Sequence, residues 1–264
     1  MDSPTTPRRV RLLGGEVDLV SPKEMLGLVD VMASAGGPAV IANHNAHSLF
    51  LLRRSAELAA FFDDADLIQI DSTPLIHWGR LLGLPLNAAL RSTYLDWRDD
   101  FWRLANERHW RVFYLGGAPG VADTAVRRLA ERWPNVTLAA RHGYFDPTPT
   151  SCGNRQVLDE IAAFDPDILF VGMGMPLQGT WVHENRAALT RGVIFTVGAA
   201  FDYEAGAQAT PPRWTGRLGV EWLARLIAQP RRLAFRYLIE PWSLVGPALE
   251  DLGAALGRRA AQPR

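Results

Sequence analysis

The stretch Asp167-Ile168-Leu169-Phe170-Val171-Gly172-Met173-Gly174 decides the fold, because an uninterrupted apolar run ends in two closely spaced glycines. A strand that is apolar at successive positions is typical of a sheet covered on both faces. A helix-like stretch follows at once, over residues 178–188. Five more runs are predicted to be buried strands, at residues 39–42, 67–70, 112–115, 136–139 and 193–197, and most of them are nearly continuous in apolarity.

Helix-like stretches separate these runs. They lie at residues 23–33, 46–62, 74–82, 95–107, 121–132 and 155–164. The alternation predicts a Rossmann-like α/β fold, which is a mostly parallel sheet with helices on both faces. Such sheets bind ligands at the carboxyl ends of their strands. The residues that follow each strand are therefore the candidates for a functional site.

The pattern changes after Asp202. Residues 210–214 are predicted to form a proline-containing loop. Three predicted helices follow without a strand between them, at residues 216–228, 230–239 and 242–258. We therefore divide the chain into an α/β core, residues 1–209, and a helical appendage, residues 210–264. The appendage is basic, because arginines outnumber acidic residues in it.

Composition limits the possible partners. The 264 residues carry a formal net charge of +0, so we expect no nucleic-acid partner. The single cysteine, Cys152, excludes an internal disulfide and a cysteine-rich zinc site. The stretch from Met1 to Arg9 is polar and has no apolar h-region, so we expect no signal peptide. No apolar run is long enough to span a bilayer, so we expect any membrane contact to be peripheral.

Two glycine clusters follow predicted strands and precede predicted helices. The first contains Gly116 and Gly117, and the second contains Gly172 and Gly174. Glycine lets the backbone approach a ligand closely, and a helix N-terminus offers N–H groups to a phosphate. Gln178 follows the second cluster, where its amide can face a sugar or a diphosphate. The alternative is a pair of plain tight turns with a solvated glutamine.

Asp71 follows the predicted strand at residues 67–70 directly. A carboxylate at this end of a strand is well placed as a general base, which would take the proton of an acceptor hydroxyl. The alternative is a cap for the helix that begins near Pro74.

Two asparagines and two histidines follow the strand at residues 39–42. Asn43 and Asn45 carry amides suited to sugar hydroxyls, with a turn or a helix cap as the alternative. His44 and His47 lie beside them and are placed to touch a substrate.

Two acidic pairs imitate the DxD signature of metal-dependent sugar transferases. Asp64-Ala65-Asp66 and Asp165-Pro166-Asp167 both precede their strands, whereas a ligand site belongs after them. The histidines form no HExxH motif. We therefore expect neither a metal site nor a cofactor.

Arginines recur among aromatic and aliphatic residues in the appendage. Arg225, Arg231, Arg232 and Arg236 are the central ones. Arginine binds phosphates with paired donors, and interleaved aromatic residues suit a membrane interface. The alternative is an ordinary amphipathic helix with a solvated charged face.

A longer series of spaced residues runs through the second half of the chain. It comprises Pro166 to Gly174, Pro176, Gln178, Trp181, Glu184 to Arg186, Val197-Gly198, Phe201-Asp202, Ala205-Gly206, Pro212 to Trp214, Leu218-Gly219, Glu221-Trp222, Arg225-Leu226, Pro230 to Leu233 and Arg236 to Leu238. This series resembles the WecG/TagA/CpsF glycosyltransferase family, and weaker matches extend the resemblance upstream to Ala39.

The resemblance implies an inverting, metal-independent transferase of cell-surface polysaccharide or exopolysaccharide synthesis. Its donor would be a UDP-sugar and its acceptor a saccharide linked to polyprenyl diphosphate. It would act at the cytoplasmic face of the membrane, to which the appendage would attach peripherally. A homo-oligomer is possible.

The resemblance also implies roles for individual residues. Asp71 matches the catalytic base and Gln178 an active-site glutamine. The appendage arginines would close over the donor diphosphate; they are Arg225, Arg232 and Arg236. The donor side would further include Gly116, Gly117, Gly172, Gly174 and Asp202. The acceptor side would include Asn43, Asn45, Thr93 and Asp96.

Three residues depart from the family pattern. Ser72 and Tyr94 stand where glycine is usual, and Asn43 stands where threonine is common. These departures predict a donor other than N-acetylmannosamine, such as glucose or glucuronic acid, although all three sugars remain candidates. Arg91 or His44 would then pair with a uronate carboxylate.

Two other functions remain open on the residues alone. One is a nucleotide-dependent oxidoreductase or epimerase on the same fold class, although neither glycine cluster has the dinucleotide form GxGxxG. The other is a non-catalytic protein of a polysaccharide complex at the membrane surface.

Overall fold

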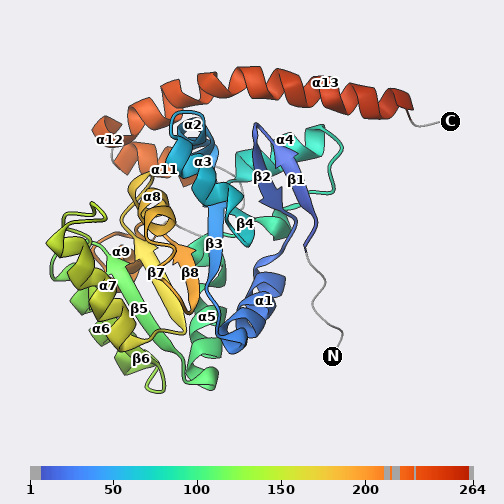
Figure 1. The fold of residues 1–264 in the computed structure, drawn as a ribbon. Helices are drawn as coiled ribbons and strands as arrows, with labels where there is room; N and C mark the ends of the chain where they lie inside the picture. Colours follow the sequence, from blue (N-terminus) through green and yellow to red (C-terminus); the bar gives the residue numbers. More distant parts are fainter. Residues whose placement is uncertain (1–6, 211–214, 216–220, 229, 262–264) are drawn as a thin grey trace.

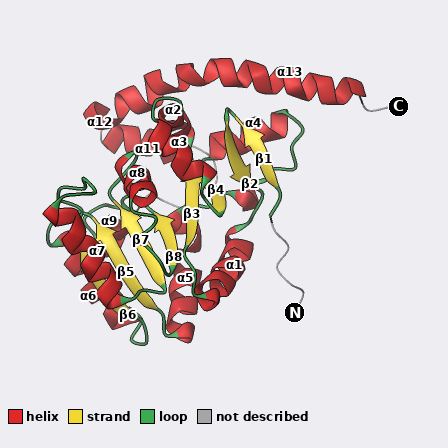
Figure 2. Cartoon of the chain, in the orientation of Figure 1, coloured by secondary structure: helices red, strands yellow, loops and turns green. Residues whose placement is uncertain are grey.

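The computed structural model describes residues 7–210, 215, 221–228 and 230–261, and its centre is a six-stranded parallel sheet (Figures 1 and 2). The strand order is β4-β3-β8-β7-β5-β6. The bounds are β3 (Ala39–His44), β4 (Leu67–Ile70), β5 (Arg111–Gly116), β6 (Thr137–Arg141), β7 (Ile168–Gly172) and β8 (Val193–Thr196). The predicted strands and the Rossmann-like fold are confirmed.

Helices cover both faces of the sheet, and alternate strand residues pack on opposite layers. Phe170 and Phe195 share one core cluster, and Leu169 and Ile194 share the other. The first layer contains α1 (Pro22–Ala35), α5 (Tyr94–Arg108), α6 (Val121–Arg132) and α9 (Ala200–Ala205). The second contains α3 (Ala56–Asp63), α7 (Cys152–Phe164) and α8 (Leu177–Glu184). Burial on two faces explains why inner strands such as β7 and β8 are almost wholly apolar.

The order of the strands creates a switch point in the sheet. The chain passes from β3 outward to β4 at one edge, and later from β5 outward to β6 at the other. β7 and β8 then fill the middle. Because all six strands are parallel, their carboxyl ends share one edge, where a ligand site is expected.

The helix expected over residues 46–62 is two helices. α2 (Ala46–Leu52) ends at Arg53, and α3 begins after Ser55. The Ser55 hydroxyl accepts a hydrogen bond from the backbone N–H of Leu58 at 3.1 Å, which caps α3. The continuous apolar pattern hid this restart, although serine is a favoured cap. The short helices α9 and η1 (Ala88–Leu90) were not predicted either.

A β-hairpin precedes the sheet, and the sequence analysis missed it. β1 (Arg9–Leu12) pairs with β2 (Gly15–Asp18) through a two-residue turn of Leu13 and Gly14. Both turn residues have positive φ, 52° and 82°, as a type I′ turn requires. The alternation of arginine with apolar residues over β1 was the available signal.

Asp18 attaches this hairpin to the sheet. Its carboxylate accepts two hydrogen bonds of 2.9 Å from the guanidinium of Arg9. It also accepts one of 2.7 Å from the backbone N–H of Ile68 in β4. The side chain is almost fully buried, and these three donors satisfy it.

The C-terminal segment (residues 221–261) is helical over its described residues, which are 221–228 and 230–261. It contains α11 (Glu221–Ala228), α12 (Pro230–Ala234), the π-helix η2 (Phe235–Ile239), the 3₁₀-helix η3 (Glu240–Leu244) and α13 (Val245–Ala261). The predicted stretches at 230–239 and 242–258 therefore run into one another. The start of the first predicted stretch and the loop at 211–214 lie outside the described residues. Figure 1 shows this segment lying across the carboxyl edge of the sheet.

Part of the C-terminal segment packs on the hairpin and on α4. Asp251 in α13 accepts hydrogen bonds from the backbone N–H of Leu13 at 2.8 Å and from the indole of Trp78 at 3.0 Å. Leu244 and Ala255 are buried in a third apolar cluster with the hairpin and α4 (Thr73–Leu81). The first and last parts of the chain therefore stabilise each other.

We expect Asp251→Ala to loosen this contact, because two partly buried donors lose a charged acceptor. The free energy of unfolding should fall by about 2 kcal/mol. Urea denaturation measures this, and limited proteolysis should show faster cleavage in α13. Glu250→Ala removes an exposed carboxylate from the adjacent position and should change neither. Equal behaviour of the two variants would contradict the role of Asp251.

Candidate functional site

A cavity of about 450 Å³ lies at the carboxyl ends of β3 and β4, between the sheet and the C-terminal segment. The α/β part of the chain that precedes the C-terminal segment, called the body below, contributes Asn45, His47 and Asp71 to the walls of the cavity. The C-terminal segment contributes Trp222 and Arg236. The structure therefore brings three of the predicted site residues, Asp71, Asn45 and Arg236, to one place.

Asp71 is held at the tip of β4. Its backbone N–H donates to the carbonyl of His44 at 2.9 Å, so the ends of β3 and β4 stay side by side. The cap position of α4 belongs to Ser72, not to Asp71. The half-buried carboxylate is thus part of the cavity wall, where a general base can reach a bound hydroxyl.

Two arginines line the cavity from different elements. Arg91 follows η1, and its backbone forms an isolated parallel β-bridge with Ile70 of β4. Arg236 comes from η2. The guanidinium of Arg91 lies 3.2 Å from the carboxylate of Asp96. Guanidinium groups bind phosphate oxygens in pairs, so these walls suit an anionic ligand.

Thr93 and Asp96 make their hydrogen bonds to other groups of the protein. They form a capping box at the start of α5, in which the Thr93 hydroxyl donates to Asp96 at 2.6 Å. Asp96 also pairs with Arg91 and lines a second, smaller cavity of about 320 Å³ beside the first. Their contact with the main cavity is therefore indirect, through the position of Arg91.

Asn43 lies within a strand, not after it. β3 continues to His44, and the Asn43 amide donates to the carbonyl of Thr196 at 2.9 Å, which ties β3 to β8. Asn45 is the cap of α2, since its side-chain oxygen accepts from the backbone N–H groups of His47 and Ser48. The helix-cap alternative is confirmed for Asn45, which lines the cavity as well.

The prediction that His44 pairs with a substrate carboxylate is wrong. The side chain is completely buried, its ring stacks on Phe62 at 3.9 Å, and Nδ1 lies 2.9 Å from the Ser48 hydroxyl. Burial lowers the pKa of His44 from 6.5 to about 3. A neutral, enclosed imidazole offers no charge to a uronate.

Close packing of strand ends explains two of the four candidate glycines. A Cβ on Gly116 would lie 2.4 Å from the carbonyl oxygen of Gly172, and one on Gly172 would lie 2.5 Å from that of Gly198. Gly117 and Gly174 instead have positive φ, 67° and 81°, which glycine adopts without strain. All four lie on the carboxyl edge but outside the lining of the main cavity.

Gln178 holds two of the strand-end turns together. Its amide oxygen accepts hydrogen bonds of 3.1 Å from the backbone N–H groups of both Gly174 and Gly198. The side chain is only 3% exposed, so the solvated alternative is wrong. Asp202, in the first turn of α9, reaches the first glycine turn, with Oδ1 3.7 Å from where a Cβ on Gly117 would stand.

Two predicted arginines are described only in part. Arg225 and Arg232 belong to α11 and α12, but their side chains lie outside the described part of the structure. Tyr94, which departs from the family pattern, is in the core. Its hydroxyl donates to Glu204 at 2.8 Å and accepts from the Trp102 indole at 2.9 Å, so its ring is accommodated by packing.

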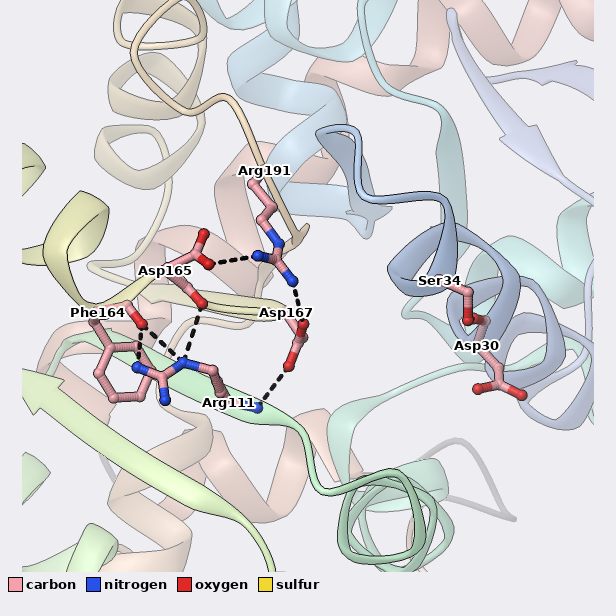
Figure 3. Close-up of polar contacts among 7 residues, drawn as sticks. All are labelled: Asp30, Ser34, Arg111, Phe164, Asp165, Asp167 and Arg191. Carbon is pink, nitrogen blue, oxygen red and sulfur yellow. Dashed lines mark hydrogen bonds and ion pairs between the residues drawn. The ribbon is translucent and has the colours of Figure 1, made fainter.

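The acidic pairs lie at the opposite edge of the sheet. Asp165 and Asp167 both pair with Arg191, and Asp167 accepts from the backbone N–H of Arg111 at 2.8 Å (Figure 3). Asp66 accepts from the backbone N–H of Val40 at 2.7 Å. Within the described ranges, no three His, Cys, Asp or Glu side chains gather as metal ligands would.

The sequence analysis missed the partner of His47. Nδ1 of His47 lies 2.6 Å from a carboxylate oxygen of Glu240, which is 193 residues away in the chain. Burial and the nearby charge of Arg236 lower the pKa of His47, and Glu240 opposes this shift. No local pattern marks such a pair, because only the packing of η3 on α2 creates it.

Fold and site together define a parallel α/β protein with an arginine-lined cavity at its strand tips. The chain belongs to the WecG/TagA/CpsF glycosyl transferase family, whose model matches residues 10–255. This membership makes it a glycosyltransferase and decides against an oxidoreductase, an epimerase or a non-catalytic protein.

Curated relatives carry the name N-acetylglucosaminyldiphosphoundecaprenol N-acetyl-beta-D-mannosaminyltransferase. The protein of Staphylococcus aureus strain NCTC 8325 is 30% identical over 204 residues, which is 73% of this chain and 77% of the relative. That of strain MRSA252 is 28% identical over 202 residues, with the same two shares. None of the described helices of this chain has the length and apolarity that crossing a membrane requires.

Acid should destabilise the protein through His44. The unfolded chain binds a proton at this residue near pH 6.5, whereas the folded chain resists it down to about pH 3. The free energy of unfolding should therefore fall by roughly 4 kcal/mol between these pH values. Denaturation at a series of pH values measures the slope.

His44→Asn keeps a polar group for Ser48 and should flatten this slope. The control is His109→Asn, which changes an exposed histidine whose positive φ of 56° asparagine accepts. An unchanged slope in His44→Asn would contradict the assignment.

Proposed function

We propose that this chain transfers a hexosyl group from a UDP-sugar to a saccharide linked to polyprenyl diphosphate. Transfer inverts the anomeric carbon and needs no protein-bound metal ion. The observation that carries the proposal is the placement of the Asp71 carboxylate and the Arg91 and Arg236 guanidinium groups around one cavity. The acceptor class agrees with the lipid-linked sugar in the names of the S. aureus relatives.

Asp71 is the proposed general base. It takes the proton of the acceptor hydroxyl as the oxygen attacks the anomeric carbon of the donor. The bond between that carbon and the UDP oxygen breaks on the opposite side, and UDP leaves with the bonding electrons. Guanidinium groups stabilise the charge that develops on the diphosphate, which is the role that a metal ion has in other transferases.

The donor side extends from the cavity along the strand tips. Gly116, Gly117, Gly172 and Gly174, together with Asp202, would surround UDP at the ends of β5 and β7. Gln178 fixes the shape of this edge by binding two of its turns. Arg225 and Arg232 would join Arg236 in neutralising the diphosphate.

Three donor sugars are consistent with the proposal: glucosyl, glucuronosyl and N-acetylmannosaminyl. The relatives transfer N-acetylmannosamine according to their names, at about 30% identity to this chain. Of the three departures from the family pattern, only Ser72 lines the main cavity. Arg91 is the cavity residue suited to a uronate carboxylate, since His44 is enclosed. Turnover of UDP-sugars by membranes that contain the lipid acceptor identifies the donor.

Asp71→Asn should keep the shape of the cavity but remove its base. We expect turnover to fall by about 10²–10⁴-fold, with UDP affinity unchanged within about twofold. Radiolabelled transfer to the lipid acceptor and calorimetric titration with UDP measure the two quantities. Asp63→Asn changes an exposed carboxylate on α3 and serves as the control. Normal turnover in Asp71→Asn would refute the assignment of the base.

Residues 210–264 are proposed as an appendage that lies on the cytoplasmic face of the membrane. The segment exposes many large apolar side chains, among them Trp242 and Ile227 at 72% each. The others in the described part of the segment are Trp222, Leu223, Phe235, Leu238, Ile239, Val245, Leu249 and Leu256. Exposed apolar surface of this extent marks an interaction site, and arginines near it favour anionic lipids. A peripheral position would bring the lipid-linked acceptor to the cavity.

Replacing Phe235 and Trp242 together by serine should weaken attachment to the membrane. We expect at least a tenfold lower affinity for vesicles of phosphatidylglycerol and phosphatidylethanolamine, because two exposed aromatic groups no longer enter the interface. Co-sedimentation measures it. Tyr144→Ser, which removes an equally exposed ring from the body, is the control. Undiminished binding by the double variant would exclude this surface as the membrane contact.

A further inference from the structure

His47 belongs to the wall of the main cavity, and one of its ring nitrogens is already engaged. Nδ1 lies 2.6 Å from Glu240, whose side chain is almost completely buried and does not line the cavity. A carboxylate accepts hydrogen bonds and does not donate them, so the proton between the two atoms sits on Nδ1.

Nε2 of His47 remains for a ligand. It makes no hydrogen bond with any described residue. It is also not one of the fully buried polar atoms that lack a partner, so it is not completely enclosed. His47 lines the cavity and its Nδ1 is turned to Glu240, so Nε2 is the ring nitrogen left for a molecule in the cavity.

The charged groups around the ring decide what Nε2 can recognise. Glu240 faces it from η3 and Arg236 from η2, while Asp71 and Arg91 line the same cavity. Burial and the charge of Arg236 lower the pKa of His47, which keeps the imidazole neutral at pH 7. A neutral ring with its proton on Nδ1 offers only a lone pair at Nε2. That lone pair accepts from a hydroxyl and repels a phosphate oxygen.

We propose that His47 is a substrate-contact residue whose Nε2 accepts a hydrogen bond from a hydroxyl of the acceptor saccharide, and that Glu240 is the positioning residue that orients the ring. The inference rests on the proposed function and specifies how acceptor recognition works. Because Glu240 belongs to the C-terminal segment, packing of that segment on α2 prepares the acceptor side, while its arginines serve the donor.

The tautomer is testable without turnover. Nitrogen-15 NMR of histidine-labelled full-length protein at pH 7 should show His47 with its proton on Nδ1, and Glu240→Ala should shift it toward the Nε2–H form. A wild-type ring protonated on Nε2 would overturn the proposal.

Steady-state kinetics test the contact. His47→Phe keeps a ring but no nitrogen, and we expect the KM for the lipid-linked acceptor to rise about tenfold with the KM for the UDP-sugar unchanged. His47→Gln restores an acceptor atom near the position of Nε2 and should return the acceptor KM to within about threefold of the wild type. His183→Phe, whose histidine pairs with Asp64 at the other edge of the sheet, is the control.

A purely structural role for the pair predicts a different result. His47→Phe and His47→Gln would then be equally impaired, both substrates would be affected alike, and limited proteolysis would cut the C-terminal segment faster in both. That outcome overturns the proposal. So does an unchanged acceptor KM in His47→Phe when the wild type transfers sugar normally. Absence of transfer by the wild type with every UDP-sugar would instead refute the proposed function itself, and the contact with it.

The pH profile adds a readout that packing alone would not move. The neutral ring is required, so kcat/KM for the acceptor should fall as the pH drops below 6.5 through the lowered pKa of His47. Glu240→Gln removes the charge that opposes this lowering and should shift the acid limb to lower pH. An acid limb at the same pH in both proteins would overturn the role of Glu240.

Discussion

Asp251 joins the two ends of the chain, and the cavity depends on this junction. Its carboxylate accepts hydrogen bonds from Leu13 in the N-terminal hairpin and from Trp78 in α4. Apolar contacts of Leu244 and Ala255 with the same elements reinforce it. Because one wall of the cavity comes from the C-terminal segment, a body without this contact would present Asp71 on an open edge.

Both parts of the chain contribute charged groups to the site. The body supplies the carboxylate of Asp71 and the guanidinium of Arg91, and the C-terminal segment supplies the guanidinium of Arg236 and the carboxylate of Glu240. Glu240 is used within the protein, on His47, so it adds no open negative charge to the cavity. This arrangement leaves the positive charge of the segment available for the diphosphate in the proposed reaction.

Several residues predicted to contact a ligand hold the carboxyl edge of the sheet together. Gln178 binds two turns, Asn43 ties two strands together, and Thr93 with Asp96 fixes the loop that carries Arg91. Contacts of this kind hold functional groups in place. A catalytic group that is misplaced lowers activity by more than the energy of the single contact that held it.

The sequence by itself determined the parallel sheet, because burial on both faces requires apolar runs such as Ile168 to Val171 in the inner strands. It also indicated Asp71 and the arginine-rich segment, since strand ends and charge are local features. Only the tertiary structure decided that His44 is enclosed while His47, three residues on, meets Glu240. The contact between residues 193 positions apart arises from packing of whole elements. No local pattern encodes it, because burial and partners at a strand end depend on what folds back over that end.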